Sequence, residues 1–577
     1  MVLNLSRYLP VLKWGRHYSR QYLLGDVSAA IMVILVLIPQ ALAYALLAGL
    51  PAEVGLYAAL LPAVLYALLG TSPVLAVGPV AIVSLMTASA IGQFAAPDPQ
   101  ALALTLALLS GVCLLLMGLL RLGALINFLS YPVLAGFTSA SSLLIAANQL
   151  PALVGMSSQG HTFPALVMSL WQQGTDWQPA TATLGGATLV GLWSIRRYGA
   201  AGLSRCGVSS RRAGLIVKLA PALAVIVGVL CVKSGLMPSV ALVGAIPDPL
   251  PTLTLPPLSW PLLQQLWMPA FLIAVIGFIS AIAVAQTLAM KQRQRVDPDQ
   301  ELIALGVANI GASFSGGYPV SGSLARSAVN YEVGAQTAAA GAFTALGLVL
   351  GLLVLTPWLA FLPKTVLAAT IIVAVLSLVD VKMLITSWHF ARDDFIAVAA
   401  TFSLTLLFGL EAGIVTGAAL SIGLFLWHTA RPHIAEVGRV PGTQHFRNRY
   451  RYRVQTDPTI VMLRPDESLY FANARFLEQH LYDRVVGDAQ LRHVVLLCSA
   501  VNDIDLSALN SLAAMNLRLK DLGMQLHLAE VKGPVMSRLK RSDLLDVLSG
   551  QVFLSAFEAM SHLASQPFDD HDQSRSC

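Results

Sequence analysis

The sequence predicts a polytopic α-helical membrane protein of fourteen spans, arranged as a 7+7 inverted repeat and followed by a small soluble α/β domain. The first observation is composition: of 577 residues, 56% are hydrophobic and only 11% are charged, and the mean hydropathy is +0.70. Ordinary soluble domains do not approach these values. The second is that residues 1–430 hold 13 of the 30 Asp and Glu residues, while the last 147 residues hold the other 17. The third is a series of apolar runs that stops near residue 430.

Fourteen apolar runs are each long enough to cross or half cross a bilayer. They lie at residues 26–46, 54–69, 75–91, 102–120, 131–149, 182–196, 215–232, 267–289, 301–316, 321–332, 337–357, 360–378, 394–409 and 411–428. With a cytoplasmic N-terminus, Lys and Arg fall in alternate loops, as the positive-inside rule requires. The predicted outside stretches 92–101, 149–180 and 234–263 contain neither residue. We therefore expect both termini in the cytoplasm.

These patterns divide the chain into five parts. We expect a cytoplasmic N-terminus at 1–24, a membrane domain at 25–430, a linker at 431–448, a soluble domain at 449–565 and a disordered acidic tail at 566–577. The first apolar run does not have the form of a cleavable signal, since Pro39 and Gln40 interrupt it and no small-residue cleavage site follows. The short loops and the lack of an organelle signal suit a multi-pass protein of the inner (plasma) membrane of a bacterium.

Two of the runs are interrupted where a spanning helix would otherwise continue. One contains residues 78–84 (GPVAIVS) and the other contains residues 318–326 (YPVSGSLAR). Backbone freed from helical hydrogen bonds is tolerated at membrane depth only where it is buried in protein or lines a watery cavity. Each broken run is the third in its half of the chain, and such a matched pair is typical of the midplane binding site of a transporter.

The broken runs favour an anion. If they form half helices whose N-termini meet near the midplane, each end offers unpaired N–H groups and about half a positive charge. Arg326 lies about one turn into the second half helix and adds a full charge, which brings the local total to roughly +2. The Ser323 hydroxyl can donate a hydrogen bond. A sulfate would be balanced at such a site, and a bicarbonate or chloride less fully.

Two sets of motifs resemble those of the sulfate permease (SulP) family of anion transporters. The first comprises Asp26 and residues 38–45 (IPQALAYA), 47–51 (LAGLP), 55–57 (GLY), 70–72 (GTS) and 78–79 (GP). The second comprises residues 301–306 (ELIALG), 309–310 (NI), 319–323 (PVSGS) and 326–330 (RSAVN). The resemblance implies a core domain (spans 1–4 and 8–11) that moves against a gate domain (spans 5–7 and 12–14) in an elevator-like, alternating-access mechanism, usually within a homodimer. The positions that match the family's binding motif are Gln40, Tyr44, Val80, Ala81, Ser323, Leu324, Ala325 and Arg326.

Several of these residues have simpler explanations. Gln40 could satisfy only the backbone carbonyls that Pro39 leaves unpaired, although polar residues inside a membrane are usually functional. Tyr44 could be a packing residue whose hydroxyl finds a partner. Arg326 could reach a lipid headgroup by snorkelling, but its spacing from the Pro-Val-Ser-Gly break favours the site.

One position departs from the family. Many proton- or sodium-coupled members carry a carboxylate in span 8, where this chain has Ser280, and some relatives carry an acid where it has Gln40. Uncoupled transport and anion exchange are therefore both open. Glu53 and Glu411 lie close to helix ends and are the other candidates for protonation, although charges at such boundaries are more often solvated.

The last part of the chain resembles a STAS domain. Strands are expected at 450–454, 459–463, 494–497 and 525–529, and helices around 472–486, 508–521 and 533–547. Residues 503–508 (DIDLSA) match the turn at which bacterial anti-sigma-factor antagonists are phosphorylated, so Ser507 is a possible regulatory site. The competing explanation is that Ser507 or Asp505 caps the helix. A cytoplasmic partner could bind this domain.

Other classes of function have less support. The chain has no GxxxxGK[ST] loop, no HExxH motif and no metal-ligand spacing among its eleven His and five Cys residues, so neither an enzyme nor a cofactor or metal is expected. The formal charge of +6 lies in loops between spans and is explained by topology rather than by nucleic acid. An anion channel or a membrane sensor is the alternative to a carrier, and bicarbonate, chloride and small dicarboxylates are the alternatives to sulfate.

Overall fold

The computed structural model describes residues 9–94, 98–124, 130–156, 162–172, 177–237, 239–244 and 250–564. The chain divides into two compact units, Met1–Ser421 and Ile422–Cys577, which we describe separately. The predicted disordered tail at 566–577 lies outside the described residues.

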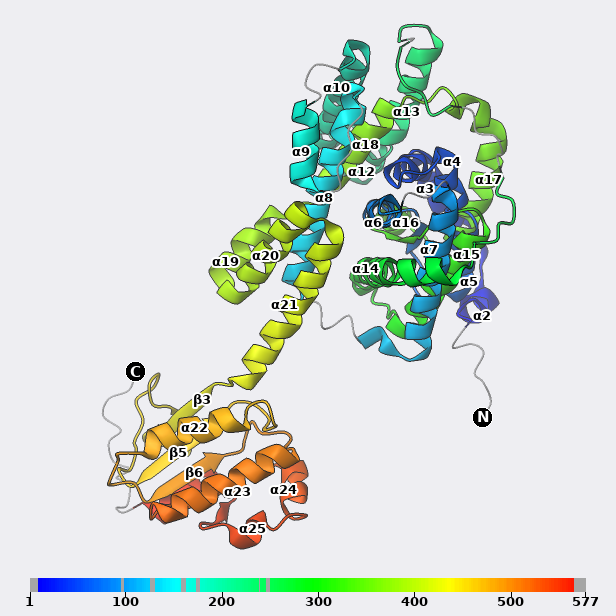
Figure 1. Ribbon diagram of the computed structural model, residues 1–577. Coiled ribbons are helices and arrows are strands. Elements are labelled where there is room, and N and C mark those ends of the chain that lie inside the picture. Colours follow the sequence, from blue (N-terminus) through cyan, green and yellow to red (C-terminus); the bar gives the residue numbers. More distant parts are fainter. Residues whose placement is uncertain are drawn as a thin grey trace. The chain divides into compact units, whose positions relative to one another are not determined.

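The first unit is almost entirely helical (Figure 1). Its elements before residue 260 are α2 (Val11–Trp14), a 3-10 turn (Gly15–His17), α3 (Arg20–Leu47), α4 (Ala52–Tyr57), α5 (Leu61–Leu69), β1 (Ala76–Gly78), α6 (Ala81–Gly92), α7 (Pro99–Leu119), α8 (Tyr131–Val154), α9 (Phe163–Gln172), α10 (Pro179–Ser194), a π-helical turn (Ile195–Gly199), α11 (Ala200–Arg205), α12 (Ser210–Lys218) and α13 (Ala220–Lys233). They are followed by α14 (Trp260–Gln292), α15 (Pro298–Phe314), β2 (Ser321–Ser323), α16 (Leu324–Val333), α17 (Ala339–Leu359), α18 (Lys364–Leu376), α19 (Val381–Phe390), α20 (Arg392–Phe408) and α21 (Leu410–Ala430). The residues of α21 from Ile422 onward belong to the second unit.

Each of the fourteen predicted runs overlaps a helix, or a strand followed by a helix, of this unit. Among the described residues, eight helical segments are long and apolar enough to cross a membrane, and the bent pair Arg212–Lys218 and Ala220–Lys233 makes a ninth. The remaining runs coincide with shorter helices, of which α6 and α16 are the two that follow a break. The fold is therefore that of a polytopic helical membrane protein, and the number of crossings stays a prediction.

The helices pack in two groups that match the predicted core and gate. In the first group, α7 contacts α14 and α15, and α17 contacts α3 and α5. In the second group, α8 contacts α18 and α20, and α10 contacts α18. Each group combines helices from the two halves of the chain, which is the arrangement that an inverted repeat produces.

Two buried carboxylates fasten the halves of the first group to each other. Asp26 on α3 accepts hydrogen bonds from the Tyr18 hydroxyl (3.0 Å), the Gln336 and Thr337 N–H groups (2.7 and 3.0 Å) and the Thr337 hydroxyl (2.6 Å). Glu301 on α15 accepts from the Tyr66 hydroxyl (2.8 Å), both the N–H and the hydroxyl of Thr71 (2.7 and 2.6 Å), and the Ser72 N–H (3.2 Å). Both carboxylates are fully buried. Their removal would leave several buried donors unpaired, so they stabilise the fold.

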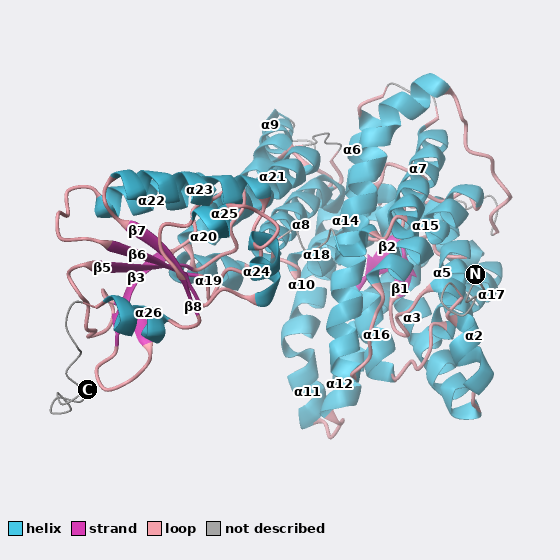
Figure 2. Cartoon of the chain, turned by 90° about the horizontal axis from the view of Figure 1, so that it is seen from below, coloured by secondary structure: helices cyan, strands magenta, loops and turns pink. Residues whose placement is uncertain are grey.

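The second unit is a six-stranded sheet with helices on both faces (Figure 2). Its elements are β3 (Ile434–Arg439), β4 (Phe446–Asn448), β5 (Ile460–Pro465), α22 (Ala474–Val485), β6 (His493–Leu497), α23 (Leu506–Asp521), β7 (Gln525–Ala529), α24 (Gly533–Leu539), α25 (Leu544–Val547), β8 (Val552–Phe553) and α26 (Ala556–Leu563). The strand order is β4-β3-β5-β6-β7-β8. Strands β5 to β8 are parallel, and β3 is antiparallel to both of its neighbours.

Alternating residues of the parallel strands build two apolar layers. Leu463 and Leu496 pack with α22 and α23 on one face, whereas Met462 and Val495 pack with α26 on the other. The strands predicted at 459–463, 494–497 and 525–529 correspond to β5, β6 and β7.

The expected linker at 431–448 and the expected strand at 450–454 are both corrected by the structure. The linker segment forms β3 and β4, whereas residues 450–454 form a turn and irregular chain. Strand β3 was hidden in the sequence because it carries Glu436 at a buried position, where Arg449 and Arg484 pair with it. Residues 450–454 do not join the sheet. The Asn448 side chain accepts from the Tyr450 N–H (2.9 Å) and so forms a turn after β4.

The Glu301 carboxylate gives a stability prediction. The substitution Glu301→Gln replaces an acceptor of four hydrogen bonds by an amide whose NH₂ group faces donors, so we expect a loss on the order of 3 kcal/mol and a lower thermal unfolding midpoint in detergent. Glu332→Gln is the matched control, because Glu332 forms a surface ion pair with Lys218 (2.6 Å) that is worth about 1 kcal/mol or less. Equal midpoints for the two variants would contradict the structural role.

A buried histidine gives a pH prediction for the second unit. His527 is 2% exposed, its Nδ1 accepts from the Gln551 N–H (3.0 Å), and its Nε2 lies 3.2 Å from Nδ1 of His493. Burial, together with the nearby His493 and His562, lowers the pKa of His527 to about 4. Between about pH 6.5 and pH 4 the unfolded chain therefore binds a proton that the folded chain does not, and stability falls as the pH falls.

The test uses the full chain with every cysteine except the buried Cys498 replaced. Dithiodipyridine labels the Cys498 thiol when the second unit unfolds, and the urea concentration at half-maximal labelling is measured at pH 7 and pH 5. The wild type should lose more stability on acidification than the His527→Gln variant, whose side chain can make the same two hydrogen bonds without titrating. His445→Gln, on an exposed residue, should behave as the wild type. An identical pH dependence in all three proteins would contradict this account.

Candidate functional site

Both broken spans consist of a short strand followed by a helix. Strand β1 pairs antiparallel with β2, with Ala76 opposite Ser323 and Gly78 opposite Ser321. Helix α6 begins three residues after Gly78, and α16 begins directly after Ser323. Pro79 has no N–H group and disfavours helical conformation in Gly78 before it, which explains why the first helix does not extend back into β1. The antiparallel pairing brings the starts of two helices from different halves of the chain together, as Figure 2 shows among the surrounding helices.

Hydrogen bonds from neighbouring helices hold β2 and the residue before it. The Asn309 side chain on α15 accepts from the Val320 N–H (2.8 Å) and donates to the Val320 carbonyl (3.0 Å). The Ser321 hydroxyl donates to the Gly277 carbonyl on α14 (2.6 Å). A Cβ atom at Gly322 would lie 2.8 Å from Cδ1 of Leu75 and 3.1 Å from the Ala281 Cα, so only glycine allows β2 to lie this close to α14.

Arg326 is the largest of the fully buried side chains, with 1% of its surface exposed. One Nη atom donates to the Pro79 carbonyl (2.9 Å) and the other donates to Oε1 of Gln40 (3.3 Å). Within the described part of the chain, Arg326 has no carboxylate partner. The positive charge is therefore fixed in place by two neutral acceptors and is not balanced by the protein.

Three more donors of the site have no hydrogen-bond partner among the described residues. They are the amide NH₂ of Gln40, the hydroxyl of Tyr44 one turn later on α3, and the hydroxyl of Ser323, which does not cap its own helix. Their residues are 7–8% exposed, so the side chains are largely buried but still accessible. Because the Arg326 guanidinium binds the Gln40 oxygen, the Gln40 amide presents donors rather than acceptors.

The other predicted positions form the first turns of the two half helices. Val80 is the half-buried residue before α6, and Ala81 is its first, buried residue. Leu324 and Ala325 begin α16 and are exposed, whereas Arg326 behind them is buried. Neither helix has a side-chain cap at its start, so the first N–H groups of both remain available to a ligand.

The last two predicted positions lie in different units, Ser280 in the first and Ser507 in the second. Ser280 is half-buried on α14, three residues after Gly277, whose carbonyl binds β2. It therefore lies beside the broken span. Ser507 is exposed on α23 in the second unit, and Asp505 caps this helix by accepting from the Ala508 N–H (2.8 Å). Phosphorylation of Ser507 stays a prediction, and the capping role belongs to Asp505.

The sequence did not identify two features of the site. One is the Pro79 carbonyl as a partner of Arg326, which no residue type could reveal. The other is Tyr318, fully buried, whose hydroxyl lies 2.9 Å from the Ser84 hydroxyl on α6. Since the Ser84 hydroxyl donates to the Val80 carbonyl (2.9 Å), Tyr318 is the donor between them. The position of Tyr318 next to the Pro-Val break was the available signal.

The arrangement can bind an anion. It combines the positive ends of two helices, one buried guanidinium and several free donors. Within the described ranges, the buried carboxylates of the first unit are Asp26 and Glu301, and both are bound by donors of the scaffold. Groups of three or more His, Cys, Asp or Glu side chains that could hold a metal ion are absent from the described residues.

Comparisons with known proteins agree with this reading. Residues 23–401 match the model of the sulfate permease family, and residues 451–559 match that of the STAS domain. The chain is 35% identical over 565 residues to sulfate transporter 4.1, chloroplastic, of Arabidopsis thaliana, which covers 95% of this chain and 81% of that protein. It is also 35% identical to the probable sulfate transporter MT1781 of Mycobacterium tuberculosis, over 94% of this chain and 96% of that one.

The fold is that of a solved transporter structure. The structure of SLC26A9 superimposes with a TM-score of 0.86 and 22% sequence identity, over 97% of this chain and 93% of that one. At this level of identity the similarity concerns the fold alone, and it covers both units. The family models and the two relatives at 35% identity establish that the chain belongs to the sulfate permease family of membrane anion transporters and carries a C-terminal STAS domain.

Proposed function

We propose that this protein is a secondary transporter that moves sulfate across the membrane, with the anion held between the N-termini of α6 and α16. The observation that carries this proposal is the buried, unbalanced guanidinium of Arg326 beside two uncapped helix starts. The formal charge of the site, roughly +2, balances a divalent oxyanion better than a monovalent one. The two relatives compared above, both named sulfate transporters, support the same choice.

The proposed donors suit a tetrahedral oxyanion. Gln40 and Tyr44 approach from α3, Ser323 from β2, and the backbone N–H groups from the first turns of α6 and α16. These donors belong to four elements, and a sulfate has acceptor oxygens on all sides to match them. Bicarbonate, chloride and dicarboxylates carry less charge or a different shape, and they are the competing substrates that the uptake experiment below compares.

We further propose an alternating-access mechanism in which the first helix group moves against the second. Both broken spans belong to the first group, and the Asp26 and Glu301 contacts fasten its two halves, so this group can move as one body. We also propose that the protein is a homodimer in the plasma membrane and that both termini lie in the cytoplasm. One relative, by contrast, is named as chloroplastic. A carrier gives saturable uptake, which separates it from a channel or a sensor.

Among the described residues, no carboxylate lies beside Arg326 that could take up a proton and couple transport to a proton gradient. Ser280 occupies the position beside β2 where coupled relatives carry an acid, and Arg326 has no acidic partner among the described residues. We therefore propose facilitated diffusion or anion exchange, in which the charge of Arg326 is balanced by the substrate itself. Under this mechanism an inward proton gradient leaves the initial rate of sulfate uptake unchanged.

The first prediction concerns sulfate uptake into proteoliposomes. The wild type should take up radiolabelled sulfate saturably, at the same rate with and without a pH gradient, and unlabelled sulfate should compete better than bicarbonate, chloride or succinate. Arg326→Ala should lower uptake about 10- to 100-fold, because hydrogen bonds to a charged group contribute about 1.5–3 kcal/mol. Arg205→Ala, on the exposed end of α11, is the control and should transport as the wild type does.

Three outcomes of this measurement would count against the proposal. Unchanged uptake by Arg326→Ala in a variant with a normal unfolding midpoint would remove Arg326 from the site. Uptake of bicarbonate or succinate without uptake of sulfate would replace the substrate. Acceleration by inward protons would require a coupled mechanism and a titrating group other than the one that Ser280 replaces.

The second prediction concerns the contact between β2 and α14. Gly322→Ala introduces a methyl group where Leu75 and Ala281 leave no room, so β2 must move and overpacking should cost about 1–3 kcal/mol. We expect weaker sulfate binding, measured by titration calorimetry in detergent. Gly186→Ala on α10, where a Cβ meets nothing within 4 Å, should bind sulfate as the wild type does. Equal sulfate affinity of Gly322→Ala and the wild type would show that the position of β2 does not control the site.

A further inference from the structure

The second unit contains a basic cavity that plays no part in the transport site. Its volume is about 340 Å³, and it is lined by His433, Arg447, Asn448, Arg451, Tyr452, Arg464 and Asp466. Three guanidinium groups and one carboxylate give this lining a formal charge of +2 before any protonation of His433. The cavity is as large as a small-molecule site, and therefore much larger than a bare oxyanion requires.

Part of the lining is fixed by its own contacts. Asp466 accepts from Nε of Arg464 (2.6 Å), and its other oxygen lies 2.8 Å from Nδ1 of His433. Burial alone would raise the pKa of Asp466, but the hydrogen bonds from Arg464 and His433 outweigh it and lower that pKa. This carboxylate is therefore already paired with Arg464 and His433.

The other two arginines of the lining are not committed. Among the described residues, the side chains of Arg447 and Arg451 make neither a hydrogen bond nor an ion pair. Asn448 accepts from the Tyr450 N–H through its side chain (2.9 Å), and its carbonyl accepts from the Arg451 and Tyr452 N–H groups (3.1 and 3.0 Å). This turn places Arg451 and Tyr452 on the same cavity as Arg447.

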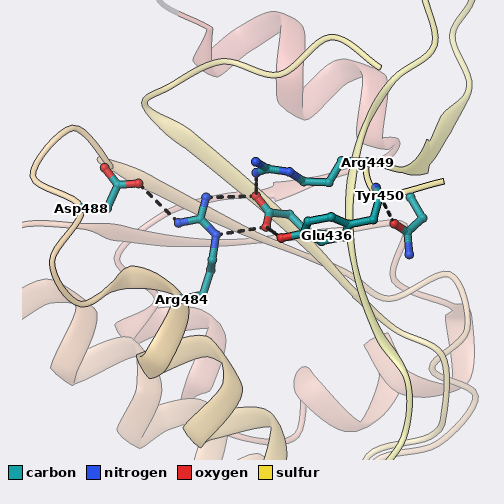
Figure 3. A network of polar contacts seen from close by, with 6 residues as sticks. Glu436, Arg449, Tyr450, Arg484 and Asp488 are labelled. Carbon is teal, nitrogen blue, oxygen red and sulfur yellow. Dashed lines mark hydrogen bonds and ion pairs between the residues drawn. The ribbon is translucent and has the colours of Figure 1, made fainter. Parts of the chain in front are cut away.

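A salt-bridge network stabilises the chain at Arg449, within this turn. Figure 3 shows Glu436 between Arg449 and Arg484, with Asp488 on the far side of Arg484. Arg484 donates to both Glu436 oxygens (3.0 Å each), and Arg449 also binds this carboxylate. The hydrogen bonds and charges of these arginines lower the pKa of Glu436 in spite of its burial. Arg449 is thus held by the scaffold, while its neighbours Arg447 and Arg451 remain available to a ligand.

The cavity also lies close to the end of a membrane helix. His433 is three residues after Ala430, the last residue of α21, and three residues span at most about 11 Å. The guanidinium of Arg431 lies over the Trp427 ring, 4.0 Å from its centroid, and both residue types are typical of a membrane interface. The last turns of α21 and the cavity belong to the same compact unit.

We propose that this cavity binds a phosphate monoester, with Arg447 and Arg451 as ligands of the phosphate group. Free guanidinium groups bind phosphate oxygens in forked geometry, and the remaining volume accepts the esterified group beside Tyr452 and Asn448. The ester could belong to a lipid headgroup, given the nearby end of α21, or to a soluble metabolite. This site is independent of the transport proposal, since it shares no residue with it.

The test is a binding titration of the full chain in detergent with four probes: dihexanoyl phosphatidic acid, glycerol 3-phosphate, inorganic phosphate and the neutral-headgroup control dihexanoyl phosphatidylcholine. We expect saturable binding of at least one phosphate monoester, weakened at least tenfold in Arg447→Gln/Arg451→Gln. The double variant Arg453→Gln/Arg541→Gln loses the same charge from exposed residues outside the cavity and should bind as the wild type does. Binding of phosphatidic acid alone would identify a lipid headgroup, and binding of glycerol 3-phosphate would identify a soluble ester.

A second variant guards against a folding defect. Tyr452→Glu places a carboxylate in the cavity at an exposed position, 56% accessible, and should also weaken binding of the ester at least tenfold. The proposal is overturned if neither monoester binds saturably, if inorganic phosphate alone binds, or if the cavity variants bind the ester as tightly as the Arg453→Gln/Arg541→Gln control.

Discussion

The proposed anion site depends on one buried charge that the described residues do not neutralise. Arg326 reaches from α16 to the Pro79 carbonyl before α6 and to Gln40 on α3, so a single side chain connects three segments that are distant in sequence. A guanidinium inside the membrane is costly to bury. Two neutral acceptors hold its position without cancelling its charge, and the missing negative charge can come from the substrate. An anion bound at such a site would balance the charge of Arg326.

Much of the scaffold serves to hold this charge in place. The β1–β2 pair replaces helical hydrogen bonds at the breaks. Asn309 binds Val320 directly before β2, Ser321 binds β2 to α14, and Tyr318 connects the chain before β2 to α6 through Ser84. Asp26 and Glu301 fasten the two halves of the same helix group at its periphery. The proposed alternating-access mechanism requires a rigid group around the candidate site, because the site must keep its geometry while the group moves.

The class of fold could be predicted from sequence, and so could most of the residues that the structure brings together as the candidate site, because both rest on visible physical patterns. Breaks of the Gly-Pro and Pro-Val-Ser-Gly type cannot face lipid, and the spacing of Arg326 from its break placed it at the site. Backbone acceptors such as the Pro79 carbonyl leave no mark in a sequence. The sequence predicts a linker where the structure has β3, because Glu436 interrupts the apolar pattern of this strand. Only the structure shows the two arginines that pair with the buried Glu436 carboxylate. The roles of Ser507 and Asp505 could likewise be separated only by seeing which side chain accepts from the helix N–H.

The central claim is that the anion lies between the first turns of α6 and α16, beside Arg326. The most direct test is anomalous diffraction at the selenium edge from crystals of the protein with unlabelled methionine, soaked in selenate, which has the charge and shape of sulfate. The account predicts one dominant selenium peak between the starts of the two helices, placed so that the selenate oxygens accept from the Ser323 hydroxyl and from the first N–H groups of α6 and α16. A dominant peak elsewhere in the membrane unit, with this site empty at saturating selenate, would contradict it.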